Sequence, residues 1–113
     1  MSDCIFCKIA NKEIPANIVY EDDDMVVFHD LAPQAPVHVL MIPKKHMDSL
    51  NHVGKEDEET MGRLIGKVKE IADNLGLMGG YRLICNCGED GMQTVKHIHF
   101  HLLGKRKMLW PPG

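Results

Sequence analysis

Three histidines alternate with apolar residues over residues 96–104, and this pattern constrains the fold more than any other part of the chain. Strict alternation predicts a β-strand, because side chains at every second position of a strand point to the same face. His97, His99 and His101 would then form a row, with about 7 Å from one to the next. The apolar residues between and after them would face the core: Ile98, Phe100 and Leu102. A row of imidazoles suits metal ligation or nucleophilic and proton-transfer chemistry, and a plain solvent-exposed edge strand is the less favoured alternative.

The rest of the chain predicts an α+β fold in one domain spanning residues 1–113. Apolar residues recur at intervals of three and four from 55 to 75, which predicts one long helix. Acidic residues crowd its start, where the helix dipole favours anions, and Gly76 follows as a C-terminal cap. Apolar and β-branched runs between turn residues predict further strands at 18–21, 25–30, 37–43 and 81–86. The resulting order, β-β-β-α-β-β, indicates an antiparallel sheet of about five strands with the helix on one face.

Charge and hydropathy narrow the range of partners. The 113 residues carry a formal net charge of −3, so no broad basic surface is expected. Duplex nucleic acid is therefore disfavoured as a partner, although a single nucleotide is not. No apolar run approaches the length of a membrane span, and the first residues lack the regions of a secretory signal. We therefore expect a cytoplasmic protein with no membrane partner, whose four cysteines are reduced thiols or metal ligands.

A Cys-x-x-Cys pair, Cys4 and Cys7, lies close to the start of the chain. A thioredoxin-like redox pair would need a preceding strand, and none precedes it. Two other interpretations stay open. The pair could be two small buried thiols, or half of a structural zinc site that takes two further ligands from elsewhere. His46 and His97 are the nearest candidates to complete such a site.

A glycine-bearing loop, residues 87–94, delivers the chain to the histidine row. Glycine allows backbone N–H groups to approach an anion closely, so the loop is a candidate phosphate contact. Such a loop alone is a weak signal and is also typical of a plain hairpin. Its position beside three histidines adds weight to the phosphate interpretation.

The motif His-φ-His-φ-His-φ-φ, in which φ is apolar, is complete at residues 97–103 and resembles the signature of the histidine triad (HIT) family. Further matches follow in order along nearly the whole chain: Lys-Glu-Ile-Pro-Ala at 12–16, Phe-His-Asp at 28–30, Pro-Gln-Ala-Pro at 33–36, Ile-Pro-Lys-Lys-His at 42–46 and Trp-Pro-Pro-Gly at 110–113. Together they resemble the Hint branch, the histidine triad nucleotide-binding proteins. The resemblance implies a small α+β unit whose sheet continues across a homodimer.

The resemblance also implies roles for individual residues. The middle histidine, His99, matches the family's nucleophile, while His101 and the upstream His38 would bind phosphate and relay protons to the leaving group. Asn86 and Thr94 match positions that bind the phosphate and orient the chemistry. Four consecutive residues would form the nucleoside pocket: Phe28, His29, Asp30 and Leu31.

Three further expectations come from the same resemblance. Relatives usually have a second glycine where this chain has Met92, so the side chain at this nucleotide-binding position would narrow the site. Some relatives hold a structural zinc that catalysis does not require, and the matching ligands are Cys4, Cys7, His46 and His97. The tail that matches residues 108–113 lies near the partner's active site in Hint homodimers.

The function that the resemblance implies is that of a purine nucleoside phosphoramidase. Such a hydrolase cleaves the P–N bond of AMP or GMP phosphoramidates through a covalent nucleotidyl-histidine intermediate. A dinucleoside polyphosphate hydrolase shares the triad, but the ending at residues 110–113 favours the Hint branch. A zinc hydrolase using all three triad histidines is disfavoured, because residues spaced along a strand cannot all lie about 2 Å from one metal. A nucleotide sensor or scaffold without a catalytic role is the remaining alternative.

Overall fold

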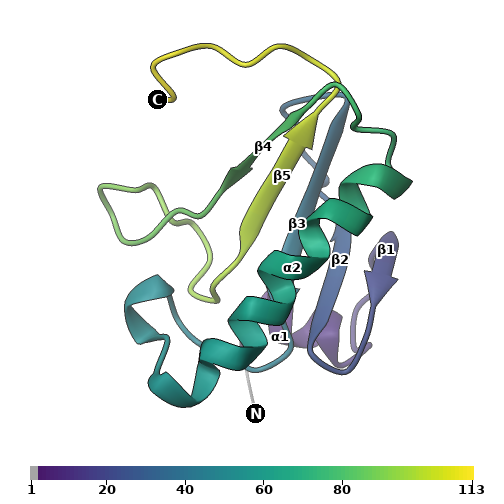
Figure 1. The fold of residues 1–113 in the computed structure, drawn as a ribbon. Coiled ribbons are helices and arrows are strands. Elements are labelled where there is room, and N and C mark those ends of the chain that lie inside the picture. The colour runs from purple at the N-terminus through teal and green to yellow at the C-terminus, as the bar shows by residue number, and fades with distance from the viewer. Residues whose placement is uncertain (1–2) are drawn as a thin grey trace.

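An antiparallel sheet of five strands forms the frame of the molecule (Figure 1). The structure, a computed structural model, describes residues 3–113. The strands, which lie side by side in the order β1-β2-β3-β5-β4, are β1 (Ile18–Glu21), β2 (Met25–His29), β3 (Val37–Pro43), β4 (Tyr81–Ile84) and β5 (Phe100–Gly104). The helical elements are α1 (Ile5–Ala10), α2 (Glu58–Asn74) and the 3₁₀ turns η1 (Leu50–His52) and η2 (Lys55–Asp57). The predicted α+β class and antiparallel sheet are confirmed.

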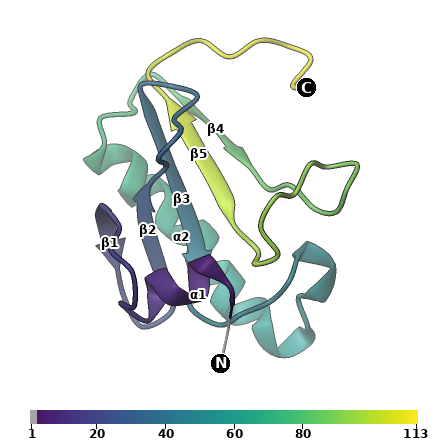
Figure 2. The same cartoon turned by 180° about the vertical axis from the view of Figure 1, so that it is seen from behind.

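The neighbouring interior strands β2 and β3 are buried on both faces over most of their length. Neighbouring side chains of a strand alternate between faces, so Val26 and Val27 belong to opposite cores. The core on one face contains buried residues of α2, and the other contains Phe6 and Ile9 of α1. Figure 1 shows α2 in front of the sheet, and Figure 2 shows α1 on the opposite side. The sheet is therefore covered in part on both faces.

The long helix α2 is amphipathic, as its periodicity predicts. Its buried stripe consists of Leu64, Val68, Ile71 and Ala72. Fully burying one large aliphatic side chain contributes about 1.5–3 kcal/mol, so this stripe fixes the helix on the sheet. The predicted span began at residue 55, but the first three residues form η2, and α2 ends at Asn74. Gly76 has a φ of 76° just beyond the C-cap, which is the left-handed conformation that favours glycine there.

The triad strand is shorter than the alternation predicted. Pairing with β3 begins at Phe100, which lies opposite Met41. The residues before Phe100 do not pair with β3. The Ile98 N–H donates instead to the Met47 carbonyl at 2.7 Å, and Pro43, at the end of β3, has no N–H with which to continue the pairing. The alternation of faces still holds, since the apolar positions are all buried in the core under α2: Ile98, Phe100 and Leu102.

The helix α1 is an element that the sequence pattern did not reveal. It begins after Cys4, whose Sγ accepts the Cys7 N–H at 3.4 Å and so caps the helix. Its Phe6 ring contacts the His99 ring edge-on, with 5.0 Å between centroids. The predicted main helix on one face is α2, and the prediction missed α1, which covers the histidine face where two of the three triad side chains are buried.

Among the helices of residues 3–113, none combines the length and the apolar character that crossing a membrane requires. The prediction that the chain starts without a secretory signal rests partly on Met1 and Ser2, which lie outside the described residues.

Candidate active site and metal cluster

A cavity of about 280 Å³ lies between α1, the end of β2 and the triad segment. Seven of the residues expected at the site line it: Phe28, His29, Asp30, Leu31, Thr94, His99 and His101. Ile5, Phe6 and Ile9 of α1 form an apolar wall that sequence reasoning missed. Three further residues expected at the site are not among the lining residues: His38, Asn86 and Met92. The fold thus assembles most of the expected nucleotide site, together with a helical wall that no motif indicated.

The ring orientation of His99 is set by its own strand. Its Nδ1 lies 2.7 Å from the main-chain carbonyl oxygen of His97. A carbonyl can only accept, so Nδ1 carries the proton and donates it. In the neutral ring, Nε2 then has no proton and keeps its lone pair. His99 is almost fully buried yet lines the cavity, so Nε2 is the candidate nucleophilic atom of the site.

His38 and His101 form a hydrogen-bonded pair beside His99. The main-chain N–H of Gln34 donates to His38 Nδ1 at 3.0 Å, so the proton of the neutral His38 ring is on Nε2. This Nε2–H donates to His101 Nδ1 at 2.9 Å. The proton of a neutral His101 ring is consequently on Nε2, the nitrogen that the pair leaves for the cavity. The site therefore combines an unprotonated ring nitrogen on His99 with a protonated one on His101.

Burial keeps this pair neutral. Burial, together with the neighbouring rings of His99 and His38, lowers the pKa of His101 to about 4, against the opposite effect of the Asp30 carboxylate. Burial also lowers the pKa of His38, although the Asp30 carboxylate, with Oδ2 3.5 Å from Nε2, acts in the opposite direction. Both rings are neutral near pH 7, as the hydrogen bonds require.

A second group of side chains, Cys4, Cys7, His46 and His97, has its ligand atoms within 4.8 Å of one another. Cys7 Sγ lies 3.2 Å from His46 Nδ1 and 3.5 Å from His97 Nδ1, and Cys4 Sγ lies 3.4 Å from His97 Nδ1. Zinc bonds of about 2.3 Å to sulfur and 2.0–2.1 Å to nitrogen, at tetrahedral angles, separate sulfur and nitrogen by about 3.5 Å. The four side chains are therefore spaced to hold one tetrahedral zinc.

The far nitrogens of the two histidines in this cluster support the same interpretation. His97 Nε2 donates to the Pro43 carbonyl oxygen at 2.8 Å, and His46 Nε2 donates to Asp48 Oδ1 at 2.7 Å. Each ring then has an unprotonated Nδ1 turned towards the cysteines. Metal-binding histidines typically have such an acceptor behind them, which fixes the tautomer and the ring orientation. Burial also lowers the pKa of His97, which favours the neutral ligand form.

A third group, Asp30, His38 and His101, also brings ligand atoms within 4.8 Å, but its hydrogen bonds do not suit a metal. A metal on His38 Nε2 would move the ring proton to Nδ1, where the Gln34 N–H already points. Within residues 3–113, no candidate ligand group contains all three triad histidines. The alternative of a catalytic zinc on the triad is therefore disfavoured by the ring orientations as well as by the strand spacing.

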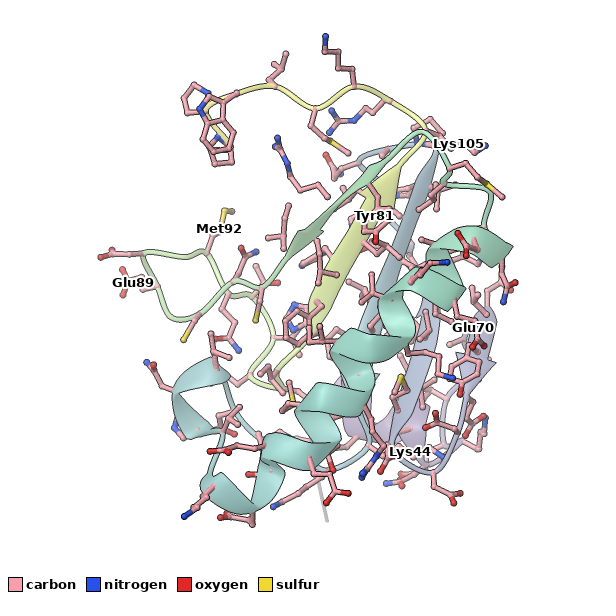
Figure 3. All side chains as sticks on the ribbon, viewed as in Figure 1. Lys44, Glu70, Tyr81, Glu89, Met92 and Lys105 are labelled. Carbon is pink, nitrogen blue, oxygen red and sulfur yellow. The ribbon has the colours of Figure 1, made fainter. Side chains whose placement is uncertain are left out.

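The loop before the triad is shaped by close backbone contacts. A side chain at Gly91 would place its Cβ 2.6 Å from the Cys87 carbonyl oxygen, so only glycine fits. Met92 has a φ of 60°, the region that favours glycine, which agrees with the glycine expected at this position. Its N–H donates to the Glu89 carbonyl within the turn, and its exposed side chain lies on the outer side of the loop (Figure 3). The Met92 side chain does not narrow the cavity, contrary to the prediction.

The chain matches the model of the HIT domain over residues 11–108, and it belongs to this family. Two curated relatives are similar over nearly their whole length. Protein HitA of Neisseria gonorrhoeae is 51% identical over 104 residues, which cover 92% of this chain and 97% of that protein. An uncharacterised HIT-like protein of Synechococcus elongatus is 52% identical over 98% of this chain and 97% of its own length.

Solved structures agree with this assignment. A HIT family hydrolase from Legionella pneumophila superposes with a TM-score of 0.95 at 49% identity, covering 98% of this chain and all of that one. A histidine triad nucleotide-binding protein from Candida albicans has a TM-score of 0.85 at 34% identity, covering 93% of this chain and 76% of that one. The fold and the triad make this chain a hydrolase-like member of the HIT family.

Proposed function

We propose that this protein is a purine nucleoside phosphoramidase that hydrolyses the P–N bond of AMP or GMP phosphoramidates. The orientation of His99 carries the proposal, because its Nδ1–H is held by the His97 carbonyl and its Nε2 lone pair is left for the cavity. The similarity to a HIT family hydrolase and to a nucleotide-binding relative supports both the reaction class and the ligand class.

The proposed reaction has two steps at phosphorus. In the first, a bond forms between His99 Nε2 and phosphorus, the P–N bond breaks, and the leaving nitrogen takes the Nε2 proton of His101, so that a neutral amine departs. The positive charge on the phosphorylated ring is stabilised by the Nδ1–H bond to the His97 carbonyl. In the second, water attacks phosphorus, frees His99 and supplies the proton that replaces the one lost with the amine. His101 offers Nε2–H to the phosphate or to the leaving nitrogen.

The cavity lining fits a nucleoside monophosphate. Phe6 and Phe28, whose rings meet edge-on at 5.7 Å, contribute an apolar wall suited to a flat base. The Asp30 carboxylate on the same lining can accept hydrogen bonds from ribose hydroxyls. Thr94, which also lines the cavity, is assigned to the phosphate, and Asn86 retains that role by resemblance alone.

The proposal includes a structural zinc on Cys4, Cys7, His46 and His97. Its support is the spacing of the four ligand atoms and the acceptors behind both histidines. A closed site with four protein ligands leaves no position for substrate, so the zinc would stabilise the fold and take no part in the bond-breaking step.

The proposal also includes a homodimer in the cytoplasm. The strand β4 is at one edge of the sheet, and its Tyr81 is exposed, so a second copy could extend the sheet there. Neither duplex nucleic acid nor a membrane is part of the proposal.

A substrate panel tests the proposed function most directly. Adenosine 5′-phosphoramidate, adenylyl-lysine and a dinucleoside polyphosphate should be assayed side by side with the same enzyme preparation. We expect release of AMP from the first two at rates well above that from the third. Preferential cleavage of the dinucleotide would instead indicate the polyphosphate hydrolase, and AMP binding without turnover of any compound would indicate a sensor.

A further inference from the structure

We propose that Arg106 is a positioning residue that sets the direction of the hydrogen-bonded pair formed by His38 and His101. The inference deepens the proposed function, on which its kinetic part rests. Arg106 follows β5, the strand that carries His101, and reaches the loop before β3, the strand that carries His38. Its Nε donates to the main-chain carbonyl oxygen of Gln34 at 2.9 Å.

Gln34 links the arginine to the histidine pair through its backbone alone. Its N–H donates to His38 Nδ1, while its carbonyl accepts from Arg106. The two groups flank the same Cα, so a donor that holds the carbonyl also limits rotation of the N–H away from the ring. The Gln34 side chain is used locally, where its Nε2 donates to the Ala32 carbonyl.

The loop that carries Gln34 has little packing to hold it. Within residues 31–36, only Ala35 is buried, and Leu31 is 99% exposed. Two of these six residues are prolines, which donate no main-chain hydrogen bond. The Asp30 carboxylate fixes the start of the loop by accepting the Ala32 N–H at 2.7 Å, and Arg106 ties its middle to the end of β5.

The direction of the hydrogen bond between His38 and His101 determines whether His101 presents an N–H or an unprotonated nitrogen to the cavity. With the Gln34 N–H on His38 Nδ1, the His38 proton is on Nε2, and His101 turns an N–H towards the cavity. In the opposite tautomer, His38 Nε2 would accept from His101 Nδ1, and His101 would present a bare nitrogen to the phosphate. A lone pair facing an anion repels it, so only the first arrangement can donate to the phosphate or the leaving nitrogen.

Ring-nitrogen NMR on the ligand-free protein tests the inference independently of any substrate. In the parent, we expect His38 with protonated Nε2 and unprotonated Nδ1. In Arg106→Ala, both nitrogens should shift towards intermediate values as the two tautomers mix, and Arg106→Lys, which retains a donor, should restore the parent pattern in part. Arg82→Ala is the matched control and should leave the His38 ring nitrogens unchanged, because Arg82 also donates to a main-chain carbonyl, that of Leu109, at 2.9 Å.

Kinetics with the best substrate of the panel add a second measurement. A misplaced donor acts on the chemical step, so kcat should fall roughly tenfold to a hundredfold in Arg106→Ala while KM changes little. Unchanged His38 ring nitrogens in Arg106→Ala would overturn the inference even if the phosphoramidase is confirmed. If Arg106→Ala shows mixed His38 tautomers but the parent protein cleaves no substrate of the panel, the positioning role is supported and only the proposed function is rejected.

Discussion

At the scale of single residues, the group behind each imidazole decides what that imidazole can do. His97 and His99 are two positions apart, and each donates one ring proton to a main-chain carbonyl. His97 donates through Nε2 and turns Nδ1 to the cysteines, whereas His99 donates through Nδ1 and leaves Nε2 for the cavity. The same residue type on the same segment thus serves two different sites.

Replacing the nucleophile should stop the reaction without unfolding the protein. His99→Ala should lose turnover because no other triad nitrogen is both unprotonated and in the cavity, yet it should still bind AMP. His101→Ala should lose less, since a donor contributes to the barrier but forms no bond to phosphorus. For the parent and both variants, steady-state kinetics measures turnover, calorimetry measures AMP binding, and circular dichroism checks the fold. Activity of His99→Ala within tenfold of the parent would rule out its assignment as nucleophile.

The histidine pair should also make the fold sensitive to acid. The pKa of His101 falls from 6.5 to about 4 on folding, so the unfolded chain binds more protons between these values. The contribution of the neutral His101 ring to the unfolding free energy is therefore fully present above about pH 6.5, and it is lost as the pH falls towards about 4. At about 1.4 kcal/mol per pKa unit, the loss is at most about 3 kcal/mol, because the partly exposed ring is screened by solvent.

Denaturant unfolding at several pH values between about 7 and about 4 measures this dependence. The slope of unfolding free energy against pH should be shallower in His101→Ala than in the parent, whatever the absolute stability of the variant. Equal slopes would show that the acid sensitivity comes from other groups.

At the scale of elements, the short helix α1 connects the two sites. Its cap and first turn provide Cys4 and Cys7, and the intervening residues Ile5 and Phe6 line the cavity. Six residues are too few for an isolated helix to be stable, so α1 depends on packing and on its cysteine end. Loss of a metal at that end should therefore loosen one wall of the nucleotide cavity.

Metal removal should affect stability and nucleotide affinity before it affects the chemistry of bound substrate. The protein purified from zinc-containing medium should hold about one zinc per chain, as a closed four-ligand site requires. Chelation, or the double variant Cys4→Ser with Cys7→Ser, should lower the melting temperature and weaken AMP binding, while kcat at saturating substrate changes less. Elemental analysis, calorimetry and thermal melts provide the data. Protein without zinc after growth in its presence would rule out the site.

The sequence predicts the helices and strands whose apolar residues recur at a regular spacing along the element. The strands β1 to β4 and the helix α2 were predicted to within a few residues because their apolar periodicity extends over most of their length. The helix α1 was not predicted, since it spans only six residues and its cap is Cys4 Sγ, an atom outside the usual capping residues. The early end of the triad pairing depends on Met47 and Pro43, which no local pattern reveals.

The same distinction applies to the site. The triad, Thr94 and the 28–31 segment were selected from motifs, and the fold brings them to one cavity. The groups that orient the rings are the Gln34 N–H, the Pro43 and His97 carbonyls and the Asp48 carboxylate. Three of these four are main-chain groups, so only the fold could identify them. The spacing of Asp48, two residues after His46, was the one available signal.

At the scale of the whole molecule, the C-terminal tail has few contacts of its own. Arg82 holds the Leu109 carbonyl, but the Trp110 side chain is 83% exposed. Within residues 3–113, no apolar surface covers this tryptophan. A tail that lies beside the open edge of β4 is placed to meet a second copy there (Figures 1 and 2).

Deleting residues 108–113 should change substrate choice more than assembly. If the tail reaches the partner's cavity, its removal should alter the relative rates for substrates with different amines, while the dimer proposed to form along β4 is retained. Sedimentation of parent and truncated protein, with rates across the substrate panel, tests both parts. A monomeric parent would exclude any cross-subunit effect, and unchanged relative rates would exclude a role for the tail.

Position 97 contributes to both sites, but through different atoms. Its side chain belongs to the metal cluster, whereas its carbonyl oxygen orients the nucleophile. Every amino acid brings that oxygen, so substitution can remove the ligand but never the acceptor. Replacement of the two cysteines and of the His97 side chain would therefore abolish the proposed metal site and still leave His99 Nδ1 a main-chain acceptor at position 97.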